Sequence, residues 1–431
     1  IARRQRQMCI RDRYTRRSFV KIASLSATAL SMPSIAFGAL PRVVVIGGGA
    51  GGATAAKYIA KDSKGKVDVT LIEASKRYYT CFFSNLYLGD FRNYGSIGHN
   101  YYGLAVNHGV NMVHEWASSV NSAEKKVYLG SGATVSYDKL VISPGIDLKF
   151  NSVNGYSPEA QSIMPHAWKS GTQVQLLKNQ VKGMKKGGTF VMVPPPNPYR
   201  CPPGPYERVS MVAHKLKKTN PSAKILILEP KPKFSKQGLF EEGWSKHYPG
   251  MIEMIGPEMG GKGVEVRPAS MEVIIDGETE KVDVCNVIPA MKAGKIAELA
   301  GVTDGNWAPT IAHTMQSRKN SDIHILGDAA AQGDMPKSGF SANSQAKVCS
   351  MAVRGELTDS KVFPAKFSNT CWSLVDTNDG IKVGASYEAT DEKIAKVSGF
   401  VSKTGEDASV RKATYEESLG WYAGITSDMF G

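Results

Sequence analysis

The sequence predicts an α/β protein built from two doubly wound domains, each a parallel sheet with helices on both faces. The first observation is a β-branched strand that runs directly into a glycine-rich turn and then into a helical pattern. The second is that further apolar strands recur along the chain, which is typical of alternating βα units. A chain of 431 residues, at about 150 residues per domain, has room for roughly three compact units. The predicted strands are residues 41–46, 67–72, 137–142, 188–193 and 321–326.

The glycine-rich turn contains Gly47, Gly49 and Gly52 in the spacing G-x-G-x-x-G, and residues 53–60 then read as a helix. These glycines permit a tight turn and let backbone N–H groups approach a pyrophosphate at the start of that helix. Glu73 ends the following strand, where a carboxylate accepts hydrogen bonds from a ribose diol. The order of strand, turn, helix, strand and acid therefore predicts a dinucleotide site in the first domain.

The strand of residues 188–193 predicts a second domain of the same type, but the sequence that follows it differs. Residues 194–196 are three prolines, where a phosphate-binding domain has glycines. Proline has no N–H to donate and cannot adopt the left-handed turn that a phosphate loop needs. We therefore expect the second domain to keep the fold and lack a nicotinamide site, so that electrons come from a small reductant.

The first 38 residues have the composition of an export signal. Of the net charge of +14, they contribute +7 (eight Lys and Arg against one acid), and the rest of the chain contributes the other +7 without a basic arm. Arg16 and Arg17 form a twin-arginine pair, followed by an apolar run over 22–37 and a small-x-small site ending at Gly38. The run is shorter than the roughly 20 apolar residues of a membrane span. We expect export to the periplasm, a mature chain from Ala39 without a membrane span, and no nucleic-acid binding.

Export places the cysteines in an oxidising compartment, where disulfides persist. Cys9 leaves with the signal, so five cysteines stay in the mature chain, an odd number. Cys285 and Cys349 lie in strand-like and helix-like apolar patterns, which predict core packing. Cys371 lies in a turn-like run beside an aromatic residue and is the best candidate partner for Cys201.

Cys201 lies in a proline-rich loop just beyond the sheet edge where doubly wound folds bind ligands. Arg200, Arg208 and the N-terminus of the following helix favour a thiolate at this position. The alternative is a structural half-cystine, which needs a partner but no positive surroundings. Glu207 is either an acid/base group near that sulfur or a solvated residue at the helix start.

Three features of the sequence concern cofactors. No cysteine begins a C-x-x-C-H motif, so we expect no haem on this chain, and the eight histidines lack paired-ligand spacing, which argues against a metal site. Residues 137–145 and 321–329 resemble the auxiliary motifs of flavoproteins with two dinucleotide domains. In such proteins the Gly-Asp carboxylate, here Asp328, binds the ribityl chain of FAD. This resemblance implies FAD as the ligand of the first domain.

Residues 78–81 (Tyr-Tyr-Thr-Cys) and 200–208 (Arg-Cys-Pro-Pro-Gly-Pro-Tyr-Glu-Arg) are more specific than the glycine loop. With residues 420–426, they resemble the flavoprotein subunit of flavocytochrome c sulfide dehydrogenase, and the resemblance extends over the mature chain. It implies that this chain oxidises sulfide and passes electrons to a c-type cytochrome subunit, which carries the haem.

The same resemblance implies a role for each residue of the site. Cys81 is expected to be bonded to FAD through a thioether, and Cys201 and Cys371 to form a redox-active disulfide beside the flavin ring. Glu207 is expected near this disulfide and Trp421 close to the flavin. One disulfide, one thioether and two buried thiols would account for the five cysteines.

The resemblance also implies a division of the chain and leaves two rival functions. We expect an FAD-binding domain formed by residues 39–150 and 290–355, a second domain at 151–289, and a C-terminal segment at 356–431 that faces the cytochrome or the flavin. One rival is sulfide:quinone oxidoreductase, although the polar stretch 408–417 is unlike a membrane-binding segment. The other is a flavin carrier or docking subunit that oxidises no sulfide.

Overall fold

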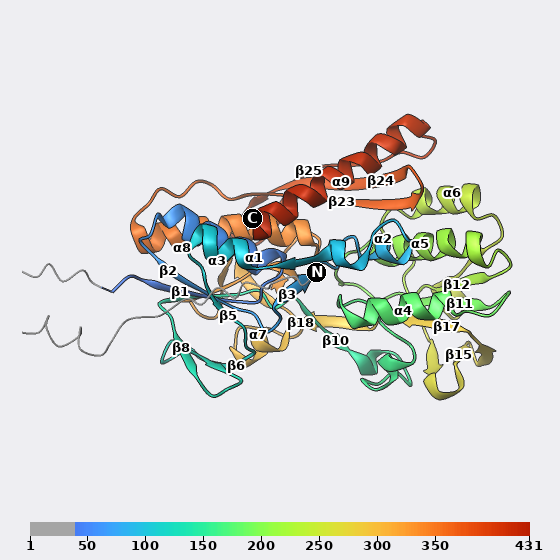
Figure 1. Ribbon diagram of the computed structural model, residues 1–431, viewed down its shortest axis with the longest axis horizontal. Helices are drawn as coiled ribbons and strands as arrows, with labels where there is room; N and C mark the ends of the chain where they lie inside the picture. Colours follow the sequence, from blue (N-terminus) through green and yellow to red (C-terminus); the bar gives the residue numbers. More distant parts are fainter. Residues whose placement is uncertain (1–38) are drawn as a thin grey trace, which may run out of the picture. The chain divides into compact units, whose positions relative to one another are not determined.

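A computed structural model describes residues 39–431, and the predicted signal of residues 1–38 lies outside them. The first domain contains an eight-stranded sheet in the order β22-β19-β20-β21-β9-β1-β2-β5, in which β21, β9, β1, β2 and β5 are parallel. Helices α1 and α8 pack together against this sheet (Figure 1). The bounds are Arg42–Ile46 for β1, Asp68–Ile72 for β2, Asn111–Val113 for β5, Lys139–Ile142 for β9, Ala308–Ile311 for β19, Gln316–Ser317 for β20, Ile323–Ile325 for β21, Ala330–Ala331 for β22, Ala50–Ser63 for α1 and Gly339–Thr358 for α8.

Smaller elements complete the first domain. A three-stranded antiparallel sheet, β6-β7-β8, lies on the side of the main sheet away from α1 in Figure 1. The remaining elements are β6 at Ala117–Asn121, β7 at Lys126–Leu129, β8 at Thr134–Ser136, β3 at Arg77–Tyr79, β4 at Gly98–Asn100, α2 at Ser84–Leu88, α3 at Tyr102–His108 and α7 at Lys295–Leu299. The strands of the main sheet therefore come from two separate stretches of the chain, before and after the second domain.

The second domain contains a parallel four-stranded sheet in the order β13-β12-β11-β17. An antiparallel pair, β10 with β18, connects it to the first domain at both chain crossings. The bounds are Thr189–Val193 for β11, Lys224–Leu228 for β12, Ile252–Ile255 for β13, Val284–Val287 for β17, Ile146–Lys149 for β10, Ala290–Ala293 for β18, Thr172–Lys182 for α4, Gly204–Thr219 for α5, Gln237–His247 for α6, and Glu265–Arg267, Glu272–Ile275 and Glu278–Lys281 for the small sheet β14-β15-β16. The predicted α/β class with parallel sheets is confirmed.

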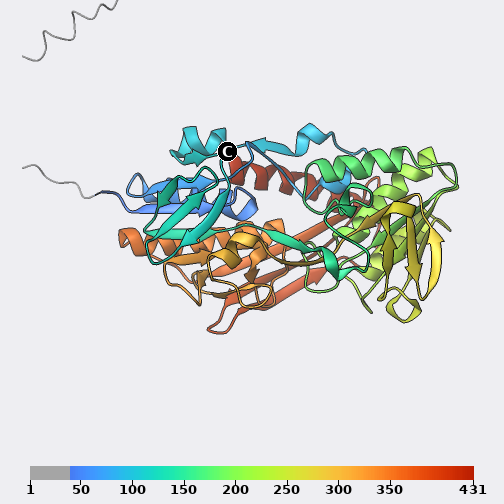
Figure 2. The same ribbon diagram turned by 90° about the horizontal axis from the view of Figure 1, so that it is seen from below.

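The C-terminal segment is an antiparallel sheet of β23 (Lys366–Asp376), β24 (Asp379–Ala389) and β25 (Ile394–Val401), followed by α9 (Ala408–Phe430). Strand β23 packs on α8 of the first domain and on α5 of the second, and α9 packs on α1 and β24. Figure 2 shows α9 and these strands extending alongside both domains. The segment therefore joins the two domains on one side of the molecule.

The predicted turn around Cys371 is wrong, because Cys371 lies within β23 and pairs with Val383 of β24. The run 367–373 is rich in small polar residues, which resembled a turn. Pairing with β24 satisfies its backbone, and packing against α5 and α8 overrides the weak local preference. The prediction for Cys285 and Cys349 is confirmed, since both are fully buried in hydrophobic clusters, on β17 and α8.

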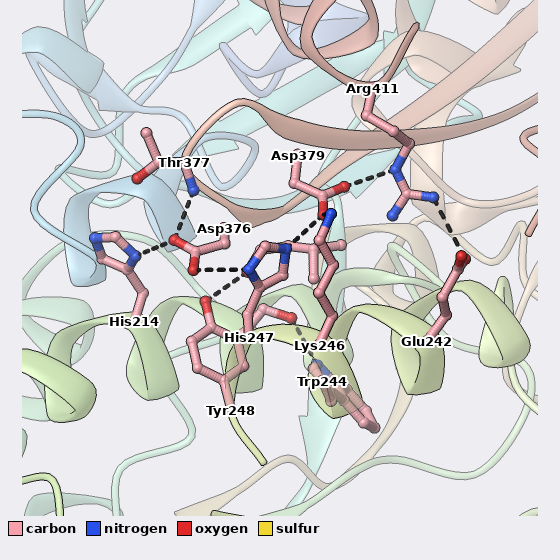
Figure 3. A network of polar contacts seen from close by, with 12 residues as sticks. His214, Glu242, Trp244, Lys246, His247, Tyr248, Asp376, Thr377, Asp379 and Arg411 are labelled. Atoms are coloured by element: carbon pink, nitrogen blue, oxygen red, sulfur yellow. Dashed lines mark hydrogen bonds and ion pairs between the residues drawn. The ribbon is translucent and has the colours of Figure 1, made fainter. Parts of the chain in front are cut away.

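A network of polar and ionisable side chains connects the β23–β24 hairpin to the second domain (Figure 3). His214 Nδ1 of α5 lies 2.6 Å from Asp376 Oδ1, and His247 Nε2 of α6 lies 2.6 Å from Asp379 Oδ2. On the other side, Arg411 Nε of α9 lies 2.6 Å from Asp379 Oδ1. Both carboxylates stand at the tip of the hairpin, so the network fixes how the strand that carries Cys371 approaches α5.

Within residues 39–431, no helix is both long enough and apolar enough to cross a membrane.

Candidate active site

The larger of two adjoining cavities lies at the carboxyl edge of the first domain's sheet, where doubly wound folds bind ligands. Its volume is about 940 Å³, at the upper end of the range for ligand pockets. The glycine turn forms one wall of this cavity, and its other lining residues include Glu73, Cys81, Arg200 and Asp328.

Two of the predicted glycines are required by the backbone itself. Gly47 has a φ of 97°, and a Cβ at this position would lie 2.3 Å from the carbonyl oxygen of Ser143. A Cβ on Gly52 would lie 1.8 Å from the Gly47 oxygen, so Gly52 allows helix and turn to approach. Gly47 and Gly49 line the cavity, whereas Gly52 lies behind them.

Glu73 lies beside the glycine turn, as expected. Its Oε2 accepts a hydrogen bond from Gly48 N at 2.8 Å, and its Oε1 accepts one from Ser75 N at 2.9 Å. A carboxylate offers about four acceptor positions, so two are left for hydroxyl groups of a ligand. Glu73 thus holds the turn in place and still faces the cavity.

Asp328 is buried at the edge of the same cavity, and one of its oxygens needs a partner. Within the described residues, Oδ1 has no hydrogen-bond donor, and Oδ2 lies 3.7 Å from Arg200 Nη1. Burial raises the pKa of this carboxyl, while Arg200 and Lys337 oppose the rise. A buried acceptor without a donor is costly, and a polyhydroxyl chain in the cavity would supply the donor. The residues present therefore fit FAD.

The smaller cavity, of about 70 Å³, collects the predicted chemical groups from four parts of the chain. Its walls include Cys81, Cys201, Glu207, Cys371 and Trp421. It also shares several wall residues with the larger cavity, among them Cys81. Since a water molecule needs about 10–15 Å³ of such volume, this cavity admits a few very small molecules.

Cys201 lies in the loop between β11 and α5, with a φ of 58° that few non-glycine residues adopt. Its N–H donates to the carbonyl oxygen of Lys337 at 2.7 Å, which fixes the loop against the first domain. Within residues 39–431, all five cysteines are free thiols. Cys201 and Cys371 line one cavity, and their pairing stays a prediction.

The expected thiolate at Cys201 is not supported, because burial raises the pKa of its thiol well above the usual value. Cys371 and Glu207 add to this rise, and Arg200 opposes it. The guanidinium of Arg208 instead donates to the side chains of Asn85 and Asn286 and to two carbonyl groups. The sequence placed these arginines near the sulfur but carried no information on burial.

Glu207 is not a solvated helix-start residue, so that alternative is wrong. Its Oε1 accepts from Leu374 N of β23 at 2.9 Å, and its Oε2 accepts from Asn85 Nδ2 at 2.8 Å. Burial raises the pKa of this carboxyl, and the two hydrogen bonds oppose the rise. Glu207 therefore lines the small cavity as a carboxyl with a raised pKa that can take or return a proton.

Aromatic rings line the small cavity beside α9. The ring of Trp421 lies 5.1 Å from Trp372 and 5.5 Å from Phe82, between ring centroids. Sequence reasoning named Trp421 but missed Asn85 and Trp168, which also line the cavity. Neither residue belongs to a recognised sequence motif, so no local sequence pattern identifies it as part of the site.

Comparisons with known proteins agree with this architecture. Residues 41–182 match the family of pyridine nucleotide-disulphide oxidoreductases. The sulfide:quinone oxidoreductase of Aquifex aeolicus has a similar structure, with a TM-score of 0.69 and 18% identity, covering 90% of this chain and 92% of that one. An NAD-dependent persulfide reductase from A. fulgidus gives a TM-score of 0.61 at 16% identity, covering 87% of this chain and 77% of that one. The fold and the site thus define a flavoprotein of the oxidoreductase class with two dinucleotide-type domains.

More specific matches cover the second domain and the C-terminal segment. Residues 174–289 match the central part of the sulfide dehydrogenase [flavocytochrome c] flavoprotein chain, and residues 364–430 match the flavin-binding part of flavocytochrome c sulphide dehydrogenase. The flavoprotein chain from Chlorobaculum thiosulfatiphilum is 52% identical over 44 residues, which are 10% of this chain and 90% of that sequence. The chain belongs to the family of flavocytochrome c sulfide dehydrogenase flavoprotein chains.

A more distant relative is the mitochondrial sulfide:quinone oxidoreductase of Mus musculus, 24% identical over 302 residues. The match spans 67% of this chain and 65% of the mouse protein.

Proposed function

We propose that this protein oxidises sulfide through a disulfide between Cys201 and Cys371, with FAD attached at Cys81, and delivers the electrons to a c-type cytochrome subunit. The observation that supports this best is the small cavity, which is lined by Cys201, Cys371 and Glu207 and meets the larger cavity at Cys81. Its volume suits a reductant as small as hydrosulfide.

In the proposed first step, hydrosulfide attacks one sulfur of the Cys201–Cys371 disulfide. A new S–S bond forms to the attacked cysteine as a persulfide, the disulfide bond breaks, and its electron pair stays on the other cysteine as a thiolate. The hydrogen stays on the outer sulfur, within reach of a carboxyl such as Glu207 that can take or return a proton. Apolar aromatic side chains, among them Trp372 and Trp421, line the cavity beside this step.

FAD, when bound, supplies the capacity to accept two electrons and to pass them on singly. Gly47, Gly49, Glu73 and Asp328 would hold it in the larger cavity. Cys81 would anchor it at the boundary of the two cavities, so that the cofactor stays beside the disulfide.

The partner and the compartment belong to the same proposal. A cytochrome subunit is suggested by the family, whose flavoprotein chains are part of a flavocytochrome. We place its contact on the C-terminal segment 356–431, where β25 and the neighbouring face of α9 expose apolar side chains, among them Val397, Phe400, Val401 and Val410. The twin-arginine signal supports export to the periplasm.

Electron delivery to a quinone is the second candidate, favoured by the relationship to sulfide:quinone oxidoreductases. Comparing the reduction of cytochrome c with that of a soluble quinone separates the two. Faster reduction of the quinone would replace the proposed acceptor.

Anaerobic mixing with sulfide tests the proposed reaction. The wild-type protein should bleach its flavin absorbance rapidly, while Cys201→Ser should keep its FAD and show no bleaching. Cys349→Ala, which removes a core thiol outside both cavities, should bleach like the wild type. A wild type that does not bleach would support the carrier function instead, and a Cys201→Ser variant that bleaches normally would remove the disulfide from the mechanism.

Acid precipitation tests the attachment at Cys81. The flavin colour should stay with the protein, and the mass of FAD should be found on the peptide that contains Cys81. Release of all FAD into the supernatant would contradict the thioether.

A further inference from the structure

Lys236 is a buried lysine that holds the strand carrying Cys371. It precedes α6 with a φ of 62°, and 8% of the residue is exposed. Its ammonium donates to the carbonyl oxygen of Cys371 at 3.0 Å, to Ser373 Oγ at 2.8 Å and, more weakly, to the carbonyl oxygen of Ile381 at 3.4 Å. Lys236 thus contacts both strands of the hairpin, and two of the residues it contacts, Cys371 and Ser373, line the small cavity.

The three acceptors of this ammonium are neutral, as are those of the buried cations Arg208 and Lys337, whereas two other buried cations lie against carboxylates. Lys231 lies 2.6 Å from the carboxylate of Glu229, and Arg411 lies 2.6 Å from that of Asp379. In the part of the chain that the structure describes, no carboxylate lies within 4.0 Å of Lys236 Nζ. A buried cation without a counter-ion is costly to the fold, so a requirement other than stability accounts better for its presence.

Burial lowers the pKa of Lys236 to about 8, whereas Cys371, Glu207 and Cys201 act to raise it. At neutral pH most of this side chain therefore carries a positive charge. Cys371, Glu207 and Cys201 line the small cavity, and each would give this ammonium a negative neighbour when ionised.

The proposed reaction creates a negative charge in that cavity. Opening of the Cys201–Cys371 bond by hydrosulfide leaves one sulfur as a thiolate, whichever cysteine is attacked. Burial raises the pKa of both thiols, so this charge is unfavourable without a cation. Lys236 lies on the Cys371 side, and it bonds to the backbone of that residue.

We propose that Lys236 is a positioning residue whose ammonium provides the counter-charge for anionic sulfur in the small cavity, acting chiefly on Cys371. This inference rests on the proposed function, since a thiolate needs a counter-charge there only if the disulfide opens. The thiolate of Cys371 therefore forms more readily when Lys236 is charged.

Other side chains near Cys371 also shift the pKa of its thiol. Glu207 at the start of α5 disfavours a thiolate, and Asn369 and Ser338 favour it by hydrogen bonding. Tyr387 of β24 is also close, and Arg411 of α9 acts on Lys236 by repulsion. Arg411 is already paired with Asp379, whereas the charge of Lys236 acts to lower the pKa of the Cys371 thiol.

The test measures the thiol of Cys371 directly, in the full-length holoprotein with Cys201→Ser to leave one reactive cysteine of the pair. The rate of alkylation by iodoacetamide is followed against pH, and the Cys371 peptide is identified by mass. Lys236→Gln removes the charge and keeps a donor, Lys236→Met removes both, and Lys236→Arg restores the charge. Lys233→Met removes an exposed charge three residues earlier and serves as the control.

Lys236→Gln and Lys236→Met should raise the apparent pKa of Cys371 by about one unit or more, a tenfold loss of thiolate at fixed pH. Lys236→Arg should recover most of it, and Lys233→Met should change nothing. An unchanged profile in a folded Lys236→Gln protein would overturn the proposal, as would an arginine variant that behaves like the glutamine variant. Should both neutral variants fail to fold, Lys236 serves the fold and the proposal is also lost.

Because alkylation involves no sulfide, its result can contradict the role of Lys236 whether or not the protein oxidises sulfide. A wild type that does not oxidise sulfide would remove the reaction and leave the alkylation result standing. A normal sulfide reaction with an unchanged alkylation profile would remove Lys236 alone.

Discussion

Gly47 illustrates how one residue decides whether the larger cavity can form. Its φ of 97° is strained for any other residue, and a Cβ would meet the carbonyl oxygen of Ser143 at 2.3 Å. Gly65 shares a positive φ of 79° but has open space around it, with nothing within 4 Å of its Cβ position. The two positions therefore separate backbone strain from steric collision.

Gly47→Ala should lower the free energy of unfolding by about 2–4 kcal/mol and reduce the FAD content, because the turn must move away from Ser143. Gly65→Ala should cost about 1 kcal/mol and leave FAD unchanged, since it adds strain alone. Urea unfolding and the ratio of flavin to protein absorbance measure both effects. Equal flavin content in the two variants would show that the turn does not shape the site.

At the residue scale, sequence reasoning identified the groups that stand in motifs. Cys81, Cys201, Glu207 and Cys371 come together as the resemblance implied. It missed Lys236, whose contact with Cys371 spans 135 positions of the sequence and has no local signal. The expected thiolate at Cys201 is not supported, because burial raises the pKa of its thiol and depends on packing that no local pattern records.

At the scale of elements, the tip of the β23–β24 hairpin gives the structure a dependence on pH. Burial opposes ionisation of Asp376, but hydrogen bonds from His214 and from the N–H of Thr377 outweigh it and hold its pKa well below the usual range. A depressed carboxyl pKa stabilises the fold above the unfolded value, near pH 4, and this stabilisation is lost as the pH falls toward the folded value.

Asp376→Asn should therefore lower the free energy of unfolding at neutral pH by about 1–3 kcal/mol, because His214 loses a charged acceptor. The variant should also lose less stability than the wild type between pH 4 and pH 2. Asp391→Asn, at a carboxylate that is 96% exposed, is the matched control and should match the wild type. Urea midpoints across this pH range provide the measurement, and parallel curves for wild type and Asp376→Asn would exclude the hairpin as the acid-sensitive element.

The second domain's sheet bears on which reductant the protein uses. Glu229, just after β12, corresponds in position to Glu73 after β2, but here the carboxylate is buried and bonded to Tyr206 and Lys231. Lys231 in turn donates to the carbonyl oxygen of Pro195 at 2.8 Å. The carboxylate of Glu229 is thus already bonded to side chains of its own domain. It lies beside a loop whose prolines have no N–H groups to bind phosphate.

NADH should accordingly reduce the flavin at least about tenfold more slowly than sulfide, a difference of 1.4 kcal/mol or more in activation free energy. Stopped-flow absorbance under anaerobic conditions compares the two reductants, with NADPH as a further comparison. Rates of similar size would mean that the second domain binds nicotinamide nucleotides in a way that its proline loop does not indicate.

Strands and helices were predicted best where the local sequence pattern agrees with the way the segment packs in the fold. The strand at 41–46 and the helix after it appear as β1 and α1, because the apolar run 43–46 suits a strand buried on both faces. The segment around Cys371 was misread, since its polar residues face partners from α5 and α8 that sequence cannot supply.

At the scale of the whole molecule, the small cavity depends on parts of the chain that are far apart in sequence. Cys81 comes from the first domain, Cys201 from the second, Cys371 from the C-terminal hairpin and Trp421 from α9. The return of the chain to the first sheet after the second domain makes this convergence possible. Composition and periodicity indicate the sheets, whereas the convergence was accessible through resemblance alone.

The last prediction concerns the proposed Cys201–Cys371 crosslink, which would tie the second domain to the C-terminal segment. Loop-closure theory gives about 5 kcal/mol for a crosslink that closes a loop of about 170 residues. A reactive disulfide is more oxidising than a structural one, so the oxidised protein should gain less, about 2–4 kcal/mol over the reduced protein. Cys201→Ser should unfold like the reduced wild type and should not respond to oxidant.

Urea unfolding with and without dithiothreitol measures this difference, and peptide mapping identifies the bonded cysteines. Cys285→Ala is the control, because it removes a buried thiol outside the small cavity and should leave the response to dithiothreitol intact. Equal stability of oxidised and reduced wild type, or a bond mapped to Cys285 or Cys349, would contradict the crosslink. The FAD site would be unaffected by that outcome, because its glycine turn, Glu73 and Asp328 lie in the first domain.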